Sequence, residues 1–358
     1  MRVQREQDPR VLKLRDLYRK HGRSALVLTR NANLTWLLGG RTWVGTAGDT
    51  GLCKAVINDS GVYVLTNNIE GERLRREEFG DGPEFVITPW QDSAAAEAAQ
   101  WSLAGENPLV DTTCENEMFL LRTVLLPEQE EEARQVALLC GRAVTQVVED
   151  VKPGMTEFEI SGCLCRRALS LGLQPIVLFT PVDEHIATYR HALSGERKLE
   201  KLVMLSMGAN KNGVHASITR FLSFGAPSKE TLLTQDRAYS VAAHLYTTTR
   251  PGVSYSDLYH EMELAYANAG CPEQLALHHQ GGPGGFQVRE TRLMPDSPLS
   301  VHAHQIYAWN PSVTGFKSED MLLVGETENS LLTLTPDFPH KDYVAGNRVW
   351  TLPQILSL

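Results

Sequence analysis

The sequence predicts an α+β protein, in which an N-terminal α/β domain precedes a second domain built from two related halves. Apolar runs typical of strands alternate with helical patterns over residues 1–120. Further along, a Pro-Gly phrase occurs twice, as VKPGMTEFEI at 151–160 and as TRPGVSYSDLY at 249–259. Two apolar hairpins follow, at 202–225 and 305–324, each with an Asn/Gly or Thr/Gly turn.

The N-terminal domain reads as strands and helices in alternation. Its helical segments are the amphipathic stretch 8–22, the charged stretch 69–79 and the alanine-rich stretch 93–103. We expect strands at 24–30, 33–40 and 85–90, and a hairpin over 51–68 that turns at Asp59-Ser60-Gly61.

The second domain begins with a helix that starts at Pro127. Proline suits the first helical turn, and the acidic residues that follow suit the positive end of the helix dipole. With residues 121–127 as the joint, we expect one domain at 1–122 and the other at 123–358.

The repeated phrase indicates an internal duplication. In each copy a helix ends, Pro-Gly turns the chain, and Thr156 or Ser254 caps a new helix with an acidic residue three positions later. Polar residues recur at similar places in the two hairpins that follow. We therefore expect a site between the halves that contains Ser206, Ser217, Asn310 and Glu319.

Composition excludes several classes of protein. The chain has 358 residues, 42% of them hydrophobic, and a net charge of −9, so it lacks the basic character of nucleic-acid-binding proteins. No stretch approaches the ~18 apolar residues of a membrane span, and the charged N-terminus has no apolar signal region. The six cysteines show no disulfide or zinc spacing. We expect a cytoplasmic protein without nucleic-acid or membrane partners.

Four phrases resemble the creatinase/prolidase/aminopeptidase P family, and the likeness covers nearly the whole chain. They are YRH (189–191), GVHASITRFLSFG (213–225), HHQGGPGG (278–285) and WNPS with SEDMLLV (309–324). The resemblance implies a creatinase-like N-terminal domain and a pita-bread catalytic domain with two-fold internal duplication. It also implies a small-molecule substrate and a homodimer.

Members of that family bind two divalent metals through five ligands. Carried over by motif, those positions are Ser206, Ser217, His279, Asn310 and Glu319, so three carboxylates are replaced. A dinuclear site needs several carboxylates to offset the metal charge and to bridge the ions. We therefore expect the dinuclear site to be lost and no cofactor to be required.

One divalent metal, such as manganese or zinc, is the alternative. His215 lies two residues before Ser217 in a predicted strand, so His215, His279 and Glu319 could form a set of two histidines and one carboxylate. The structural alternative is that His215 is a polar strand residue. His302 and His304 form a second alternate pair, for which a structural role is favoured.

Creatinase has the same fold and works without metal, using a histidine as general base and acid. The matching residue here is His191, whose ordinary pKa near 6.5 suits proton transfer at neutral pH. Glu319 would orient water or hold a cationic substrate group, and His279 would bind a carboxylate or an oxyanion. The structural alternative makes His191 an ordinary loop residue.

Further residues are candidates for substrate binding. Arg289 and Arg190 could hold a carboxylate, and the N-terminal domain of the family often reaches over a partner's site. The candidates are Arg190, His278, Arg289, Asn310, Ser206, Ser217 and His215, with Trp36, Arg41, Trp43 and Glu70 in the N-terminal domain.

The leading function predicted from the sequence is a metal-independent, creatinase-like hydrolase. It would cleave a C–N bond in a small amino-acid-derived or dipeptide-like substrate, with His191 as general acid and base. The alternatives are a mononuclear metallopeptidase or amidase that uses His279 and Glu319, and a pita-bread pseudoenzyme that binds without turnover.

Overall fold

The computed structural model describes residues 7–46, 48–80 and 82–358. The chain divides into two compact units, Met1–Thr123 and Val124–Leu358, whereas the sequence analysis places the boundary between residues 122 and 123. Within the described residues, no helix is both long enough and apolar enough to cross a membrane.

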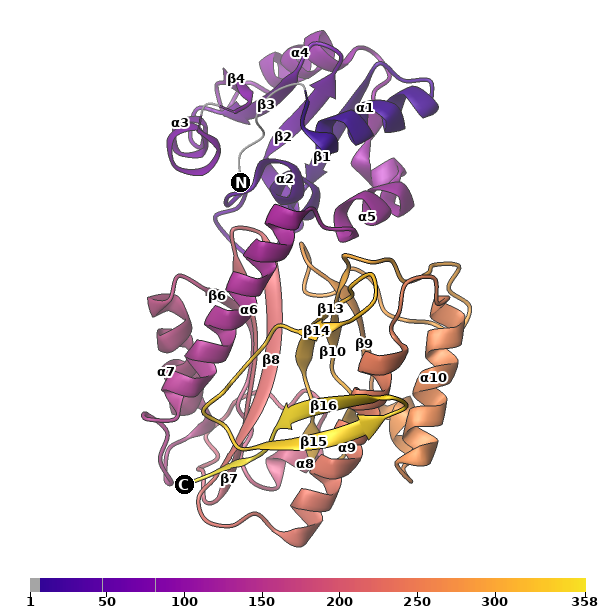
Figure 1. Cartoon of the computed structure of the whole chain (residues 1–358). Helices are drawn as coiled ribbons and strands as arrows, with labels where there is room; N and C mark the ends of the chain where they lie inside the picture. The colour runs from indigo at the N-terminus through magenta and orange to yellow at the C-terminus, as the bar shows by residue number, and fades with distance from the viewer. Residues whose placement is uncertain (1–6, 47, 81) are drawn as a thin grey trace. The chain divides into compact units, whose positions relative to one another are not determined.

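The first unit is a mixed sheet with helices, and its described residues form five strands in the order β4-β3-β2-β1-β5 (Figure 1). The strands are β1 (Ala25–Arg30), β2 (Thr50–Asn58), β3 (Val62–Asn67), β4 (Glu84–Thr88) and β5 (Leu109–Val110). The helices are α1 (Pro9–Lys20), α2 (Asn31–Leu38), α3 (Gly71–Arg73), α4 (Ser93–Ala104) and α5 (Glu115–Thr123).

The strand predicted at 33–40 is wrong, because this segment lies in helix α2. Its apolar run is buried on all sides, so alternation could not distinguish a strand from a buried helix. Thr35 Oγ1 donates 2.8 Å to the carbonyl of Asn31 one turn earlier, and Gly39, with φ of 73°, ends the helix.

The other elements predicted for this unit are confirmed. The helix over 69–79 forms as α3 followed by a π-helical stretch, Leu74–Phe79. The hairpin of β2 and β3 turns where expected, because Asn58 Oδ1 accepts the backbone N–H groups of Ser60 and Gly61.

The second unit contains two four-stranded sheets, ordered β17-β8-β7-β6 and β14-β13-β10-β9 within residues 124–358. The first sheet consists of β6 (Gln174–Phe179), β7 (Leu202–Lys211), β8 (Val214–Ser223) and β17 (Leu356–Ser357). The second consists of β9 (Gly281–Gly284), β10 (Ile306–Trp309), β13 (Asp320–Leu323) and β14 (Ser330–Leu331). Two short ladders pair β11 (Ser312–Val313) with β12 (Phe316–Lys317), and β15 (His340–Ala345) with β16 (Arg348–Pro353).

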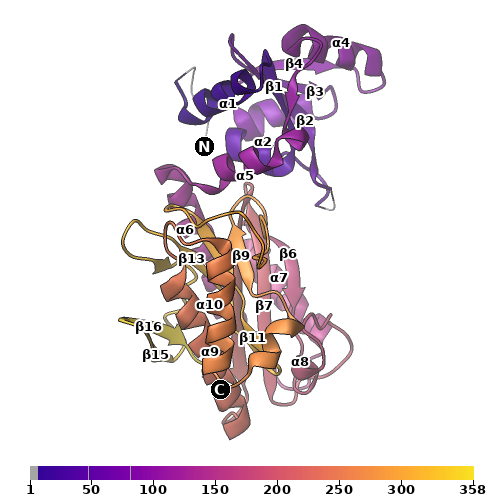
Figure 2. The ribbon, with the colours of Figure 1, turned by 90° about the vertical axis from the view of Figure 1, so that its right-hand side faces the viewer.

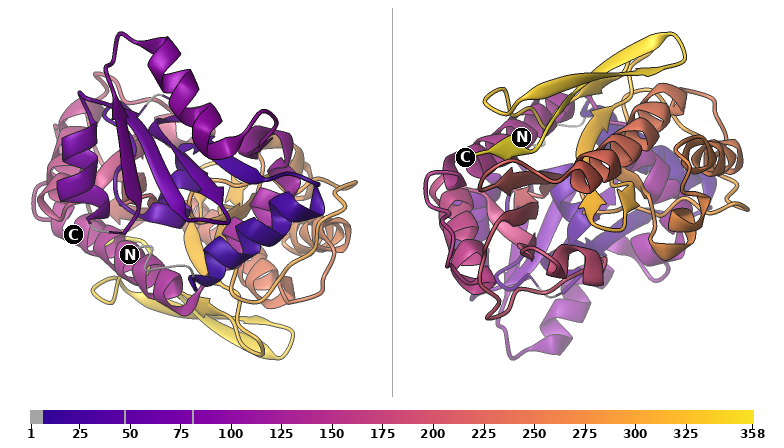
Figure 3. Two further views of the ribbon diagram at one scale, coloured as in Figure 1. Left: turned by 90° about the horizontal axis from the view of Figure 1, so that it is seen from above. Right: turned by 90° about the horizontal axis from the view of Figure 1, so that it is seen from below.

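Helices cover these sheets. They are α6 (Pro127–Val147), α7 (Glu157–Ser170), α8 (His185–Thr188), α9 (Lys229–Thr248) and α10 (Tyr255–Asn268). Helix α6 packs along β8. Helices α9 and α10 lie side by side, as Figure 2 shows. The β15–β16 hairpin packs on α9 and lies at the periphery of this unit in both views of Figure 3.

Equivalent hydrogen bonds in the two halves confirm the internal duplication. The N–H of Gly154 donates to the carbonyl of Leu199, and that of Gly252 donates in the same way to Val301, at 2.7 and 2.9 Å. Thr156 caps α7 through the expected capping box, and Ser254 caps α10. The two sheets also match in strand order, so the pita-bread fold predicted from the sequence is present.

Both hairpins form, although their details differ. The first turns at Asn212 and Gly213, whose φ angles of 51° and 93° suit the turn that joins antiparallel strands tightly. The second is interrupted: β10 pairs with β13 at its base, β11 pairs with β12 at its tip, and Gly315 turns the chain. The interruption places residues 318 and 319 between two short strands.

The glycine-rich part of HHQGGPGG forms a strand. Residues 281–284 are β9, paired antiparallel with β10. A Cβ on Gly281 would lie 2.3 Å from the carbonyl oxygen of Ala308, and a Cβ on Gly282 would lie 2.3 Å from that of Thr291. Close packing of backbone on backbone therefore requires glycine here.

A buried ion pair joins the two halves of the second unit. Arg220 on β8 donates through Nη2 to Asp320 Oδ1 on β13 at 2.7 Å, and both side chains are at most 2% exposed. Thr333 and Thr335 complete the network, since Thr335 Oγ1 accepts from Arg220 Nε and Thr333 Oγ1 donates to Asp320. This pair fixes β13, and with it residue 319, against β8.

We predict that Arg220→Met lowers the free energy of unfolding by about 3–5 kcal/mol, because it leaves the Asp320 carboxylate buried without its charged partner. Denaturant unfolding followed by circular dichroism measures this change. The matched control is Arg348→Met, which removes an exposed pair with Glu328 and should cost less than about 1 kcal/mol. Equal losses in the two variants would contradict the account of the ion pair.

Candidate functional site

Polar side chains share one face of the first hairpin. Across β7 and β8, Ser206 lies opposite Thr219, Gly208 opposite Ser217, and Asn210 opposite His215. Because side chains alternate along a strand, these positions all point to the same side of the sheet. Ser206, Ser217 and Thr219 are at most 3% exposed, so the polar face is buried.

The second hairpin brings a charged pair to this face. An isolated bridge joins Thr219 to Glu319, with the N–H of Thr219 donating 3.1 Å to the carbonyl of Glu319. Lys317 Nζ donates to Glu319 Oε2 at 2.8 Å and to Ser206 Oγ at 2.7 Å. The predicted site between the halves therefore contains an ammonium group, which the sequence analysis did not place there.

One oxygen of the Glu319 carboxylate accepts several hydrogen bonds. Its Oε2 accepts from Lys317, from Thr219 Oγ1 at 2.8 Å and from Ser206 Oγ at 3.2 Å. Burial alone would raise the pKa of this carboxyl, but the charges of Lys317 and Arg289 and the hydrogen bonds of Lys317 and Thr219 outweigh it and lower the pKa to about 2. The cation that Glu319 holds therefore belongs to the chain itself, whereas the sequence predicted a water molecule or a cationic substrate group at this carboxylate.

Arg289 is the second cation at this carboxylate. Its side chain is 12% exposed, and Nη2 lies 3.8 Å from Glu319 Oε1. Nη1 donates 3.1 Å to the carbonyl of Val288, while the buried Nε–H has no hydrogen-bond partner among the described residues. Arg289 therefore contributes positive charge and one unused donor to the site.

Three histidines lie together next to this charged pair. The Nε2 atoms of His191 and His278 are 3.0 Å apart, and the rings of His278 and His279 stack at 4.4 Å between centroids. The ring of His191 also stacks on Phe179, over which Lys317 Nζ lies 5.7 Å from the ring centroid. The structure thus brings His191, His278, His279 and Glu319 into one neighbourhood.

The surroundings hold these histidines in their neutral form at neutral pH. Partial desolvation of the His191 ring, followed by the charge of Lys317, lowers the pKa of His191. Burial and the neighbouring His279 lower the pKa of His278 to about 3, and burial with Arg289 lowers that of His279 to about 4. The Nδ1 atoms of His278 and His279 are buried without a partner within the described residues.

Glu157 positions the segment that carries His191. This buried carboxylate accepts hydrogen bonds from the N–H groups of Val182 and Gly195, at 3.1 and 2.8 Å, and lies 2.6 Å from His185 Nδ1. The segment is therefore fixed on both sides of His191, which itself remains exposed. Glu157 begins α7 directly after the cap that the repeated phrase predicts.

Three more of the residues predicted for the site form hydrogen bonds within the chain: His215, Asn310 and Arg190. Asn210 Nδ2 donates 2.8 Å to His215 Nε2, and burial lowers the pKa of His215 to about 4. Asn310 donates its N–H to the carbonyl of Gln280 at 2.9 Å, while its Oδ1 has no partner in the part of the chain that is described. Arg190 Nη2 donates to Gln274 and Thr314 and so ties the loop before β9 to the tip of the second hairpin.

His302 and His304 do not share the face of a strand, which corrects that interpretation. They precede β10, and His304 has a φ of 66°. Its Nδ1 lies 2.5 Å from Glu130 Oε1 and its Nε2 lies 3.4 Å from Glu326 Oε1, contacts that raise its pKa, chiefly through Glu130. His304 therefore fastens the start of α6.

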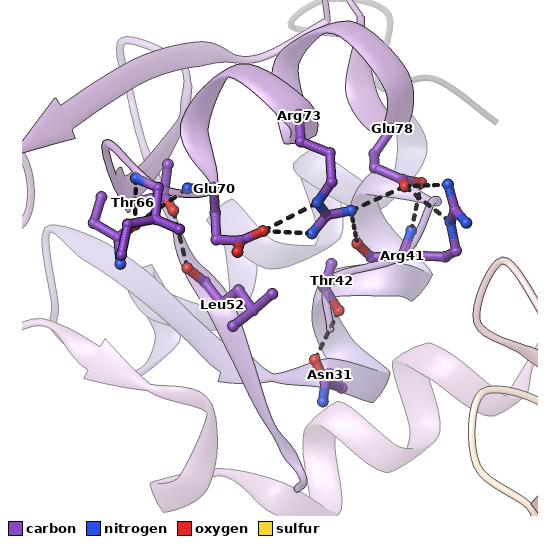
Figure 4. Close-up of polar contacts among 10 residues, drawn as sticks. Asn31, Arg41, Thr42, Leu52, Thr66, Glu70, Arg73 and Glu78 are labelled. Atoms are coloured by element: carbon purple, nitrogen blue, oxygen red, sulfur yellow. Dashed lines mark hydrogen bonds and ion pairs between the residues drawn. The ribbon is translucent and has the colours of Figure 1, made fainter. Parts of the chain in front are cut away.

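Two of the candidates in the first unit take part in a local charge network (Figure 4). Arg41 Nε donates 2.9 Å to Glu78, and Arg73 donates to both Glu70 and Glu78, at 2.8 and 3.1 Å. Trp36 is buried in α2, and Trp43 is half-buried. These contacts account for Arg41 and Glu70 as parts of that unit's own structure.

Comparison with known proteins identifies the family. The model of metallopeptidase family M24 matches residues 131–326, more than half of the chain. The chain belongs to metallopeptidase family M24. The model of the creatinase/prolidase N-terminal domain matches residues 10–112. Both matches confirm the resemblance seen in the sequence.

Individual relatives of this M24 protein are distant. An uncharacterized peptidase of Staphylococcus haemolyticus is 25% identical over 225 residues, which cover 60% of this chain and 63% of the relative. The match thus spans less than two thirds of that relative. The X-Pro aminopeptidase of Thermotoga maritima (TM-score 0.75, 15% identity, 97% of this chain and 99% of that one) has the same fold. So does the Xaa-Pro dipeptidase of Bacillus anthracis (TM-score 0.73, 15% identity, 98% and 99%).

The family name implies metal, but the residues at this M24 site do not fit a divalent ion. Across the described residues, no three His, Cys, Asp or Glu side chains lie close enough together to hold a metal ion. The alternative set of His215, His279 and Glu319 is therefore not assembled: His215 accepts from Asn210, and Glu319 is held by Lys317. A divalent ion about 4 Å from an ammonium group would be repelled by about 8 kcal/mol at an effective dielectric constant near 20.

Three residues of the site were not predicted from the sequence: Lys317, Thr219 and Gln280. Lys317 lies two residues before Glu319, and Thr219 lies two residues after Ser217, so the alternation of strand side chains could have indicated both. Gln280 contacts Tyr266 and the carbonyl of His278 and so orients the histidine segment. No local signal marks Gln280, because its partners are distant in sequence or belong to the backbone.

We predict that Glu319 contributes to the pH dependence of stability. Its pKa is lowered from 4.5 to about 2, so its carboxylate stabilises the fold above pH ~4.5, and this contribution is lost as the pH falls toward ~2. The difference in unfolding free energy between the wild type and Glu319→Gln should shrink by about 3 kcal/mol over that range.

Denaturant unfolding at a series of pH values measures this difference, with Glu328→Gln as the control that removes an exposed carboxylate. A wild-type advantage over Glu319→Gln that stays constant from pH 6 to pH 2 would show that Glu319 is not held as an ionised, paired group.

Proposed function

We propose that this M24 protein is a metal-independent hydrolase that cleaves a C–N bond in a small amino-acid-derived or dipeptide-like substrate. The observation that carries the proposal is the contact between His191 Nε2 and His278 Nε2 at 3.0 Å, next to the Lys317–Glu319 pair. Such a pair offers a neutral base together with fixed positive charge nearby. Relatives named as peptidases and X-Pro dipeptidases support a hydrolase of this general kind.

The two histidines divide the proton transfer between them. In the neutral pair one Nε2–H donates to the other Nε2, so the pair can accept one proton and share it. His191 is exposed and takes the proton from water while the oxygen of that water adds to the carbon of the scissile C–N bond. When the C–N bond breaks, the imidazolium returns the proton to the departing nitrogen.

Under this proposal, the fixed cations and the unpaired donors stabilise negative charge on the substrate. Arg289 has a buried Nε–H without a partner among the described residues, and His279 has an unpaired Nδ1. Donors of this kind stabilise the negative charge that develops on the substrate as the tetrahedral intermediate forms. Glu319, by holding Lys317 and Arg289, acts as a positioning residue.

A binding protein without turnover is the second candidate. The observation that favours it is that Glu319 Oε2 already accepts three hydrogen bonds, from Lys317, Thr219 and Ser206. In that case the site would hold a ligand through the same unpaired donors, with no proton transfer.

We predict that His191→Ala reduces hydrolysis by at least about 100-fold, the usual contribution of a general acid–base group, and that the wild-type activity survives exhaustive chelation with EDTA. A panel of Xaa-Pro dipeptides, other dipeptides and guanidino acids, assayed for release of the amine product, provides the measurement. The control His260→Ala removes an exposed histidine on α10 that pairs with Glu263 and should leave the rate unchanged.

An activity that EDTA abolishes and manganese restores would overturn the proposal. Binding of a panel compound without release of product in any assay would favour the binding protein.

The pH profile gives a separate prediction. Since the pKa of His191 lies below its usual value, the acid limb of kcat/KM should fall below pH ~6.5. Lys317→Met removes one of the charges that lower this pKa, so the acid limb should move to higher pH. Initial rates of the wild type and of Lys317→Met at a series of pH values test this. An acid limb at the same pH in both proteins would show that Lys317 does not lower the pKa of His191.

A further inference from the structure

The centre of the second unit has the geometry of a metal site but contains the chain's own cation. Lys317 Nζ contacts Ser206 Oγ and Glu319 Oε2, and Glu319 Oε2 in turn accepts from Thr219 on the other strand of the first hairpin. The ammonium group therefore links oxygen atoms from both halves of the domain, as a bridging cation would.

We infer that Lys317, assisted by Arg289, is a tethered cation that takes the place of a bound metal ion in this site. The inference deepens the proposed function and rests on it for its catalytic meaning, but its test requires no turnover. In this role Lys317 joins the two hairpins and keeps Glu319 ionised.

The donors of Lys317 are used within the site. Two of its N–H groups point to Ser206 and Glu319, and Nζ also lies over the ring of Phe179, 5.7 Å from its centroid. The side chain is 9% exposed, so it does not extend its charge to solvent as a surface lysine does. A lysine buried in this way is held by its partners.

The other oxygen atoms of the site suit an ammonium group better than a divalent ion. Ser206, Ser217 and Asn310 offer neutral oxygens, which accept hydrogen bonds but do not offset a double charge. Glu319 supplies one negative charge, while Lys317 and Arg289 supply two positive charges at 2.8 and 3.8 Å from it. A divalent ion would increase the net positive charge that this site already has.

Lys317→Ala provides the test, because it removes the ammonium group and three of the four methylene groups and leaves space for a molecule of n-propylammonium. We expect the thermal midpoint of Lys317→Ala to fall by several degrees and to rise in a saturable manner as n-propylammonium is added. Lys317→Met should lose a similar amount without rescue, because the methionine side chain fills the space. The wild type should respond neither to n-propylammonium nor to manganese, and calorimetric titration should show no manganese binding.

Three results would overturn the inference: binding of one manganese ion per wild-type chain, a Lys317→Ala midpoint equal to that of the wild type, or the same response of both proteins to n-propylammonium. If Lys317→Ala does not fold, a double-mutant cycle with Lys317→Met and Glu319→Gln decides instead. The cycle should show coupling between the two residues, and strict additivity would overturn the inference. If the Lys317 variants behave as expected but no compound of the substrate panel is hydrolysed, the proposed function is contradicted and the inference about Lys317 stands.

Discussion

The buried pair of Lys317 and Glu319 is the interaction on which the rest of the site depends. An ion pair removed from water is retained only when good geometry and further hydrogen bonds offset the cost of desolvation. Here Ser206 and Thr219 supply those bonds from the first hairpin, so the two halves must pack in one register. Arg220 and Asp320 enforce the same register from the neighbouring positions on β8 and β13.

The chemistry proposed for the histidines follows from this pair. Lys317 and Arg289 place positive charge beside His191 and His279, and together with burial that charge disfavours the imidazolium form. A neutral imidazole at neutral pH is ready to accept a proton. In a metal-bound relative of such a site, the ion would provide the charge; in this chain, we propose that Lys317 and Arg289 do so.

The sequence predicted the scaffold well, because local signals specify it. Capping at Thr156 and Ser254, the Asn212-Gly213 turn and the repeated Pro-Gly phrase are each written in a few adjacent residues. It failed at 33–40, where uniform burial removed the periodicity that distinguishes a helix from a strand. Nor did the sequence indicate why residues 281 and 282 are glycine, because their close contacts are with backbone atoms 27 and nine residues away in sequence, at Ala308 and Thr291.

Alternation with Glu319 could have placed Lys317 on the same face, but it could not have shown the role of this lysine. A lysine in a polar segment usually faces solvent, and the contacts of Lys317 depend on how two distant hairpins meet. The most direct test of the proposed tethered cation is to determine whether the Lys317 ammonium group or a metal ion lies beside Glu319. Crystals soaked in manganese and measured at its absorption edge should show no anomalous peak beside Glu319, with Lys317 Nζ within hydrogen-bond distance of Glu319 and Ser206. A manganese peak bonded to Glu319, with Lys317 displaced from it, would contradict the account.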